Sequence, residues 1–184
     1  KVFEVCPHFH GTRNLNAPSY SPETGLYYLG INNSCMDVTF VSEEFQPGRI
    51  YRGMTSRTKQ VPGYDYVGEF VAFDPVSGRR AWERRFPRGV AMTASALATG
   101  GGVVFGGTAD RRLFALDTES GNLLWETRLN GDISGAPVTF EVDGRQYLAV
   151  GAGGKIGMTT SYARFTGTTI PQGSGVMWVF ALPE

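Results

Sequence analysis

Few residues of this 184-residue chain have the types and spacing that catalysis or metal binding requires. His8 and His10 are two residues apart, which can place both imidazoles on one side of an extended strand, but no further Cys/His cluster completes a metal site. Asp37, Glu43 and Glu44 could act as acid–base carboxylates, yet nothing in the sequence pairs them with a base or a metal. The residue types alone therefore predict no reaction.

Two further kinds of motif give equally little chemistry. The glycine-rich runs 100–102 and 151–154 neither precede a predicted helix nor contain the Lys-Ser/Thr pair of a phosphate-binding loop, so they indicate hairpin turns. No C-x-x-C-H motif for covalent haem is present. Cys6 and Cys35 are either two small buried side chains or a disulfide that closes a loop of about 30 residues, and the sequence leaves both open.

The charges argue against two classes of partner. The 17 basic and 17 acidic residues cancel, which gives no electrostatic footprint for nucleic acid or an anionic membrane. No apolar run is long enough to span a bilayer. The chain starts at Lys1 without an apolar signal segment, as expected of a processed or excised piece. A basic stretch around 79–88 is interpreted as a solvated face.

The elements that must position any site come from a repeat. Segments 70–83 and 113–126 align without gaps at an offset of 43 residues and share the pattern A-x-D-x-x-S-G-x-x-x-W-E. The Asp opens a turn by bonding its own backbone, the Gly takes the positive-φ position, and the Trp on the returning strand supplies a large packing surface. A period near 40 residues with four short strands per unit is typical of a propeller blade.

The sequence thus predicts an all-β fold of about three four-stranded blades, roughly 14–83, 93–126 and 135–183. Segments 42–66 and 153–175 are expected to be irregular loops. The final segment, 178–184, matches the third strand of the repeat and stops where the turn and tryptophan strand would follow. Three blades with an unfinished edge cannot close, so another segment must complete the propeller.

Several motifs of this sequence resemble the pyrroloquinoline quinone (PQQ)-dependent alcohol dehydrogenases of the methanol/ethanol type, over nearly the whole chain. The most specific ones are Cys6-Pro7, Gly11-Thr12-Arg13-Asn14, the run 20–28 and Cys35-Met36-Asp37. The resemblance implies the C-terminal part of an eight-bladed propeller that oxidises primary or secondary alcohols by hydride transfer to PQQ. It also implies a calcium or lanthanide ion, with the metal ligands and the catalytic aspartate outside this chain.

The resemblance assigns roles to a few residues. Asn14 matches an asparagine whose amide contacts the quinone oxygens, and Gly154 and Lys155 match a turn that borders the quinone carboxylates. Thr93 stands where methanol-type enzymes have a tryptophan near the cofactor, and Lys155 replaces another aromatic residue. Smaller groups there predict a pocket that admits bulkier alcohols, polyols or sugars. The two cysteines match a structural disulfide of the family.

The implied partners are the N-terminal remainder of the same propeller, an alcohol substrate and a cytochrome c electron acceptor, in the periplasm. Neither nucleic acid nor a membrane span is expected. The competing hypothesis is a non-enzymatic propeller with the same tryptophan repeats that acts as a periplasmic protein-binding scaffold. Asn14 and the cysteine pair favour the enzyme, because a scaffold has no need of them.

Overall fold

The structure is a computed structural model that describes residues 1–87, 90–154 and 173–181. Within these ranges the chain consists of strands, turns and loops without a helix, and all strand pairs are antiparallel. The all-β prediction is therefore confirmed. No helix in the described part of the chain is long and apolar enough to cross a membrane.

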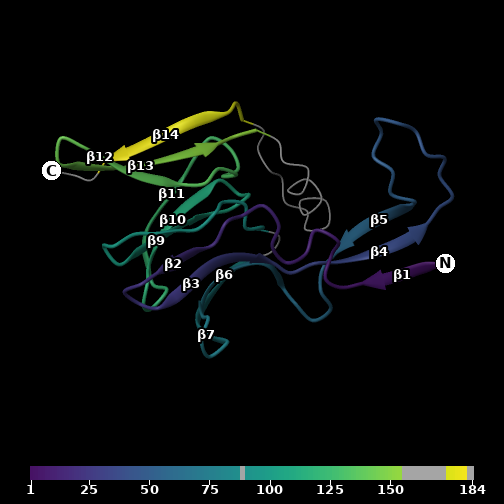
Figure 1. The fold of residues 1–184 in the computed structure, drawn as a ribbon, viewed down its shortest axis with the longest axis horizontal. Helices are drawn as coiled ribbons and strands as arrows, with labels where there is room; N and C mark the ends of the chain where they lie inside the picture. Colours follow the sequence, from purple (N-terminus) through teal and green to yellow (C-terminus); the bar gives the residue numbers. More distant parts are fainter. Residues whose placement is uncertain (88–89, 155–172, 182–184) are drawn as a thin grey trace.

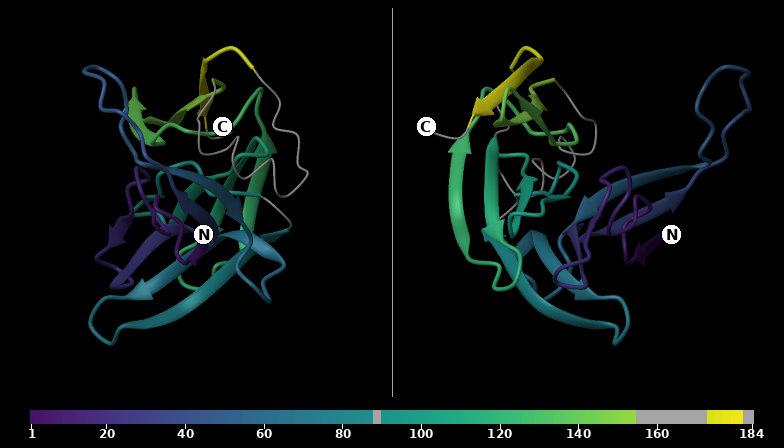
Figure 2. Two further views of the ribbon diagram at one scale, coloured as in Figure 1. Left: turned by 90° about the vertical axis from the view of Figure 1, so that its right-hand side faces the viewer. Right: turned by 60° about the vertical axis from the view of Figure 1, so that its left-hand side comes forward.

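Two of the four sheets are complete four-stranded blades. The first has the strand order β2-β3-β6-β7, with β2 (Ser19–Ser21), β3 (Leu26–Asn32), β6 (Tyr66–Asp74) and β7 (Arg79–Pro87). The second has the order β8-β9-β10-β11, with β8 (Leu97–Ala98), β9 (Val103–Gly107), β10 (Arg112–Asp117) and β11 (Leu123–Arg128). Figure 2 shows these sheets stacked side by side, as blades are.

The third blade has three described strands, in the order β12-β13-β14. They are β12 (Val138–Val142), β13 (Arg145–Ala152) and β14 (Val176–Ala181). Strand β14 takes the place that β6 and β10 occupy in the other blades, as the repeat predicts. Asp143 and Gly144 form the tight turn between β12 and β13, and both have the positive φ values that an Asp-Gly hairpin needs.

The repeated turn motif also connects neighbouring blades. Asp117 accepts hydrogen bonds from the backbone of its own turn, and Gly121 takes a φ of +71°. A Cβ on Gly121 would lie 2.6 Å from the ring of Trp82, which belongs to the preceding blade. The Trp82 indole N–H donates to the Thr118 carbonyl at 3.0 Å. The tryptophan of blade 1 thus docks on the turn of blade 2.

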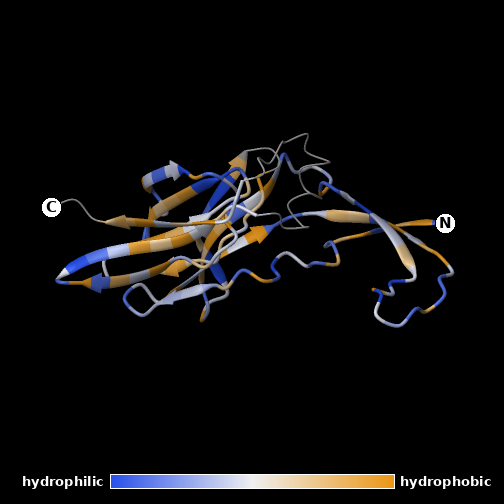
Figure 3. Ribbon diagram, turned by 90° about the horizontal axis from the view of Figure 1, so that it is seen from above, coloured by the Kyte–Doolittle hydropathy of each residue, from blue (hydrophilic) through white to orange (hydrophobic). Residues whose placement is uncertain are grey.

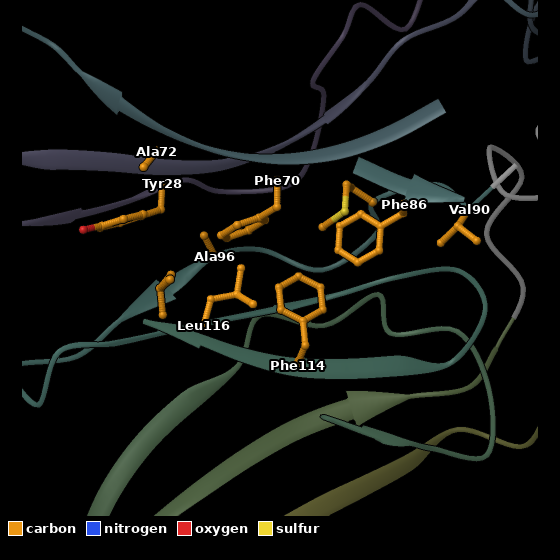
Figure 4. Close-up of a cluster of buried hydrophobic side chains, with 10 residues drawn as sticks. Tyr28, Phe70, Ala72, Phe86, Val90, Ala96, Phe114 and Leu116 are labelled. Atoms are coloured by element: carbon orange, nitrogen blue, oxygen red, sulfur yellow. The ribbon is translucent and has the colours of Figure 1, made fainter. Parts of the chain in front are cut away.

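The apolar core lies between blades, because each sheet presents one face to its neighbour. Figure 4 shows Tyr28 and Phe70 of blade 1 facing Phe114 and Leu116 of blade 2. A second cluster joins blades 2 and 3 and includes Leu113, Ile133 and Val150. In Figure 3, apolar and polar stretches alternate along the strands, as expected of sheets in which only part of the surface is buried.

A fourth sheet is a finding that the repeat does not predict. It has the order β1-β4-β5, with β1 (Val2–Val5), β4 (Cys35–Phe40) and β5 (Met54–Lys59). Figure 1 shows it projecting from the blades toward the N-terminus. The prediction of an irregular 42–66 segment was wrong for 54–59, because these polar residues form a strand by pairing with β4. A Cys6–Cys35 disulfide ties the chain after β1 to the start of β4, which confirms the predicted bridge.

Candidate functional site

Three loops enter the innermost strands of the three blades, and they converge at one end of the sheets. Loops 12–18, 90–96 and 130–137 lead into β2, β8 and β12. The turn at Gly153 and Gly154 follows β13 at the same end, because the Gly153 N–H donates to the Asp132 carbonyl at 2.9 Å. These three loops therefore lie where consecutive blades meet at this end of the sheets.

The first two loops are joined by direct hydrogen bonds. The Asn16 amide donates to the Ala94 carbonyl at 3.0 Å and to the Met92 carbonyl at 3.4 Å. The Ala17 N–H donates to the Ser95 hydroxyl at 2.9 Å. Asn16 is buried although its loop is otherwise largely exposed, so its contacts are part of the fold and not a solvated surface.

The second and third loops meet on the end of β9. The N–H groups of Thr93 and Ala94 donate to the Gly107 carbonyl, and the Ile133 N–H lies 3.4 Å from the Thr108 carbonyl. Glycine allows the third loop to lie directly on the turn after β13, since a Cβ on Gly131 would be 2.6 Å from the Cα of Gly153. The three loops therefore form one packed unit.

The predicted quinone-site residues all belong to this end where they are described. Asn14 is exposed in the first loop, and Thr93 is partly buried in the second, with its hydroxyl oxygen buried and without a hydrogen-bond partner. Among the described residues, a Cβ on Gly154 would meet no atom within 4 Å, so this part of the chain leaves the turn uncovered. Lys155 lies outside the described residues. The structure thus brings three loops of adjacent blades together around the predicted positions.

Sequence reasoning missed Asp132, a buried carboxyl group on the third loop. Neither of its carboxylate oxygens has a hydrogen-bond partner among the described residues, and burial raises the pKa of this group. A buried carboxylate without a partner is costly, so the site disfavours the charged form of Asp132. Only the tertiary packing reveals it, because the sequence shows a single aspartate between Gly131 and Ile133 with no motif around it.

The other early candidates have structural roles in the described part of the chain. His8 is buried, and its Nδ1 accepts the N–H of His10, so that Nε2 carries the proton toward the Thr58 hydroxyl at 3.1 Å. Burial, with a contribution from the neighbouring His10, lowers the pKa of His8 to about 4. Asp37 forms an ion pair with Lys59 at 2.7 Å. No group of three or more His, Cys, Asp or Glu side chains converges among the described residues.

The chain is similar to known alcohol dehydrogenases over its whole length. A family model for the glucose/ethanol/alcohol dehydrogenase β-propeller domain matches residues 82–148. The chain is 38% identical to the quinoprotein ethanol dehydrogenase of Pseudomonas aeruginosa, over 100% of this chain and 29% of the relative. It is 37% identical to the 1-butanol dehydrogenase (quinone) of Thauera butanivorans, over 98% of this chain and 28% of the relative.

A solved structure gives the same result for the fold. The europium-containing methanol dehydrogenase superposes with a TM-score of 0.86 at 28% identity, over 97% of this chain and 34% of that chain. The quinohemoprotein alcohol dehydrogenase from Comamonas testosteroni gives a TM-score of 0.75 at 26% identity, over 98% of this chain and 28% of that chain. The chain therefore spans less than a third of the length of the curated relatives it matches.

Proposed function

The chain belongs to the quinoprotein alcohol dehydrogenases, and on that premise we propose that it supplies three loops of the PQQ site in a dehydrogenase that oxidises primary and secondary alcohols. The observation that carries the proposal is the convergence of the Asn14, Thr93 and Gly154 loops at one end of adjacent blades. By the resemblance, Asn14 and Gly154 match positions that contact or border the quinone in the family, and Thr93 stands where methanol-type enzymes have a tryptophan near it.

The described residues fit a flat, anionic cofactor. Asn14 has an exposed amide, which can donate a hydrogen bond to a quinone oxygen on which negative charge develops. Gly154 presents a turn that no other described residue covers, where a ring carboxylate can approach the backbone. In this proposal Lys155 would add a positive charge beside the carboxylates.

A bound PQQ supplies the carbon that accepts hydride from the alcohol, with Ca²⁺ or a lanthanide ion polarising its carbonyl as a Lewis acid. The residues of this chain bind and orient the cofactor. In this proposal the metal ligands and the base that takes the hydroxyl proton come from the N-terminal remainder of the propeller, and a cytochrome c receives the electrons. The disulfide agrees with an oxidising compartment such as the periplasm.

Substrate size is the finer part of the proposal. Thr93 is much smaller than the tryptophan of methanol-type enzymes, so more room is left beside the cofactor. We expect longer or cyclic alcohols, and polyols or sugars, to be accepted. Strong preference for methanol over longer or cyclic alcohols would refute this part of the proposal.

The test uses the complete protein that contains this chain. It should be loaded with PQQ and either Ca²⁺ or La³⁺, and alcohol oxidation should be followed with an artificial redox dye. Dye reduction that requires both the quinone and an alcohol is the expected result. A complete protein that binds no quinone under either condition would instead favour the non-enzymatic scaffold.

A further inference from the structure

Asn16 and Asn32 hold the Thr93 loop with buried side-chain amides. The Asn32 amide donates to the Met92 carbonyl at 2.8 Å, and its oxygen accepts the Met92 N–H at 2.7 Å. Asn16 adds its bonds to the carbonyls of Met92 and Ala94. Thr93 thus stands between two residues whose backbone groups are fixed by blade 1.

Close backbone packing makes the attachment rigid. A Cβ on Gly30 of β3 would lie 2.8 Å from the Met92 side chain, and a Cβ on Gly68 of β6 would overlap the Val90 carbonyl. The Gly68 N–H donates to that same carbonyl at 3.0 Å. The Thr93 loop therefore lies directly on blade 1, although it leads into blade 2.

The attachment also includes the loop of Asn14. The Asn32 N–H donates to the Thr12 carbonyl at 2.7 Å, and Arg13 donates to the Asn16 carbonyl at 3.1 Å. Asn32 consequently contacts both the Asn14 loop and the Thr93 loop, one through its backbone and the other through its side chain. A change in its amide would alter how the two loops are placed relative to each other.

We propose that Asn16 and Asn32 form an amide clamp that positions the Asn14 and Thr93 loops for the cofactor. The inference rests on the proposed PQQ site. Neither clamp residue needs to touch the quinone, since each acts through the backbone of the Thr93 loop. Both amides are buried, and loss of the Asn16 amide would remove the donor to the Ala94 carbonyl between two blades, while the Met92 carbonyl keeps its bond from Asn32. The clamp thus fixes a two-blade site before the cofactor binds.

The test compares Asn16→Ala with Tyr28→Phe in the complete protein. Tyr28 is a matched control, because its buried hydroxyl also reaches across from blade 1 to a blade 2 carbonyl, that of Thr118 at 3.0 Å, but at the docking turn far from the clamp. PQQ affinity should be measured by absorbance titration of the apoprotein, together with the spectrum of the bound quinone. Asn16→Ala should weaken PQQ binding by about tenfold and shift the spectrum, whereas Tyr28→Phe should leave both unchanged.

Ser95→Ala provides a milder variant in case Asn16→Ala does not fold, because it removes only the exposed bond between the same loops. It should weaken PQQ binding by about two- to threefold. If the wild-type apoprotein binds PQQ, and the folded Asn16→Ala and Ser95→Ala variants bind it as tightly as Tyr28→Phe does, the clamp is wrong while the proposed function stands. If the wild type itself binds no PQQ, the proposed function fails first.

Discussion

Two carboxyl groups in the described chain are buried to the same extent, but one has hydrogen-bond partners and the other has none. Glu69 and Asp132 are each 1% exposed. Glu69 accepts two hydrogen bonds from the Arg80 guanidinium, each at 3.1 Å, and one from Asn33. Asp132 accepts none. Asp132→Asn and Glu69→Gln keep the side-chain shape and remove the charge, but only Glu69→Gln breaks an ion pair, so only Glu69→Gln should lower stability.

The expected magnitudes follow from these contacts. The asparagine amide would also be a buried polar group without a partner, so Asp132→Asn removes only the cost of burying a charge and should leave the free energy of unfolding at pH 7 unchanged or raise it by up to about 2 kcal/mol. Removing one partner of a fully buried ion pair costs about 3–5 kcal/mol. The Arg80 side chain is 44% exposed and therefore partly screened, so Glu69→Gln should cost about 2 kcal/mol.

The pH dependence gives the sign of the Asp132 effect independently. Burial raises its pKa above the ordinary value of 3.8, so the folded protein holds this proton more tightly than the unfolded chain does. The resulting loss of folding stability is absent below about pH 3.8 and grows as the pH rises from there through the raised folded pKa. Asp132→Asn removes this loss, so the difference in free energy of unfolding between the variant and the wild type should increase with pH over that range.

The assay is urea unfolding of the complete protein and both variants at several pH values. Midpoints are compared only where the dependence of the free energy of unfolding on urea concentration has the same slope. Glu69→Gln serves as the control for a buried carboxylate with partners. A wild type that is more stable than Asp132→Asn at pH 7, by a margin that increases with pH, would refute the reasoning. It would mean that Asp132 is ionised and paired in solution.

Three further predictions concern the disulfide, the buried histidine and the docking turn. Replacing Cys6 and Cys35 together by Ser should lower stability by about 3–4 kcal/mol, the loop-closure value for about 30 residues, and equal stability of reduced and oxidised wild type would contradict this. The pKa of His8 is about 4 in the folded protein, so the free energy of unfolding should fall by up to about 3 kcal/mol as the pH falls from 6.5 to 4. Acid unfolding of His8→Gln should not show this pH-dependent loss. Gly121→Ala should destabilise by more than about 1 kcal/mol, because it adds positive-φ strain to a clash with Trp82, and a neutral effect on the thermal midpoint would argue against the docking contact.

The blades could be predicted from the sequence because their signals are local. The Asp and Gly of the repeated turn act within four residues of each other, and the strands around them alternate or form apolar runs. Strand β5 was missed since Met54–Lys59 has no apolar alternation and becomes a strand only by pairing with β4. Composition cannot show a partner that is supplied by the tertiary fold.

The candidate site was predictable only in part, for a related reason. Asn14, Thr93 and Gly154 came from the family resemblance, and no local rule selects them. Asn16 and Asn32 bond to groups 60–78 residues away, so their importance is visible only in the folded chain. Asn32 could have been noticed in the sequence only as a polar residue at the end of the apolar strand β3.

The docking of Trp82 has a consequence for this segment in isolation. The turn at Gly121 of blade 2 is covered by Trp82 of the preceding blade, whereas a Cβ on Gly78 in the equivalent turn of blade 1 would meet no atom of the described residues within 4 Å. Trp125 of blade 2 already contacts Phe180 of blade 3, with ring centroids 5.4 Å apart, so within the described chain it does not cover the Gly78 turn. The outer face of blade 1 therefore lacks a neighbouring blade in the isolated segment, and isolated chains should associate through this face as their concentration increases.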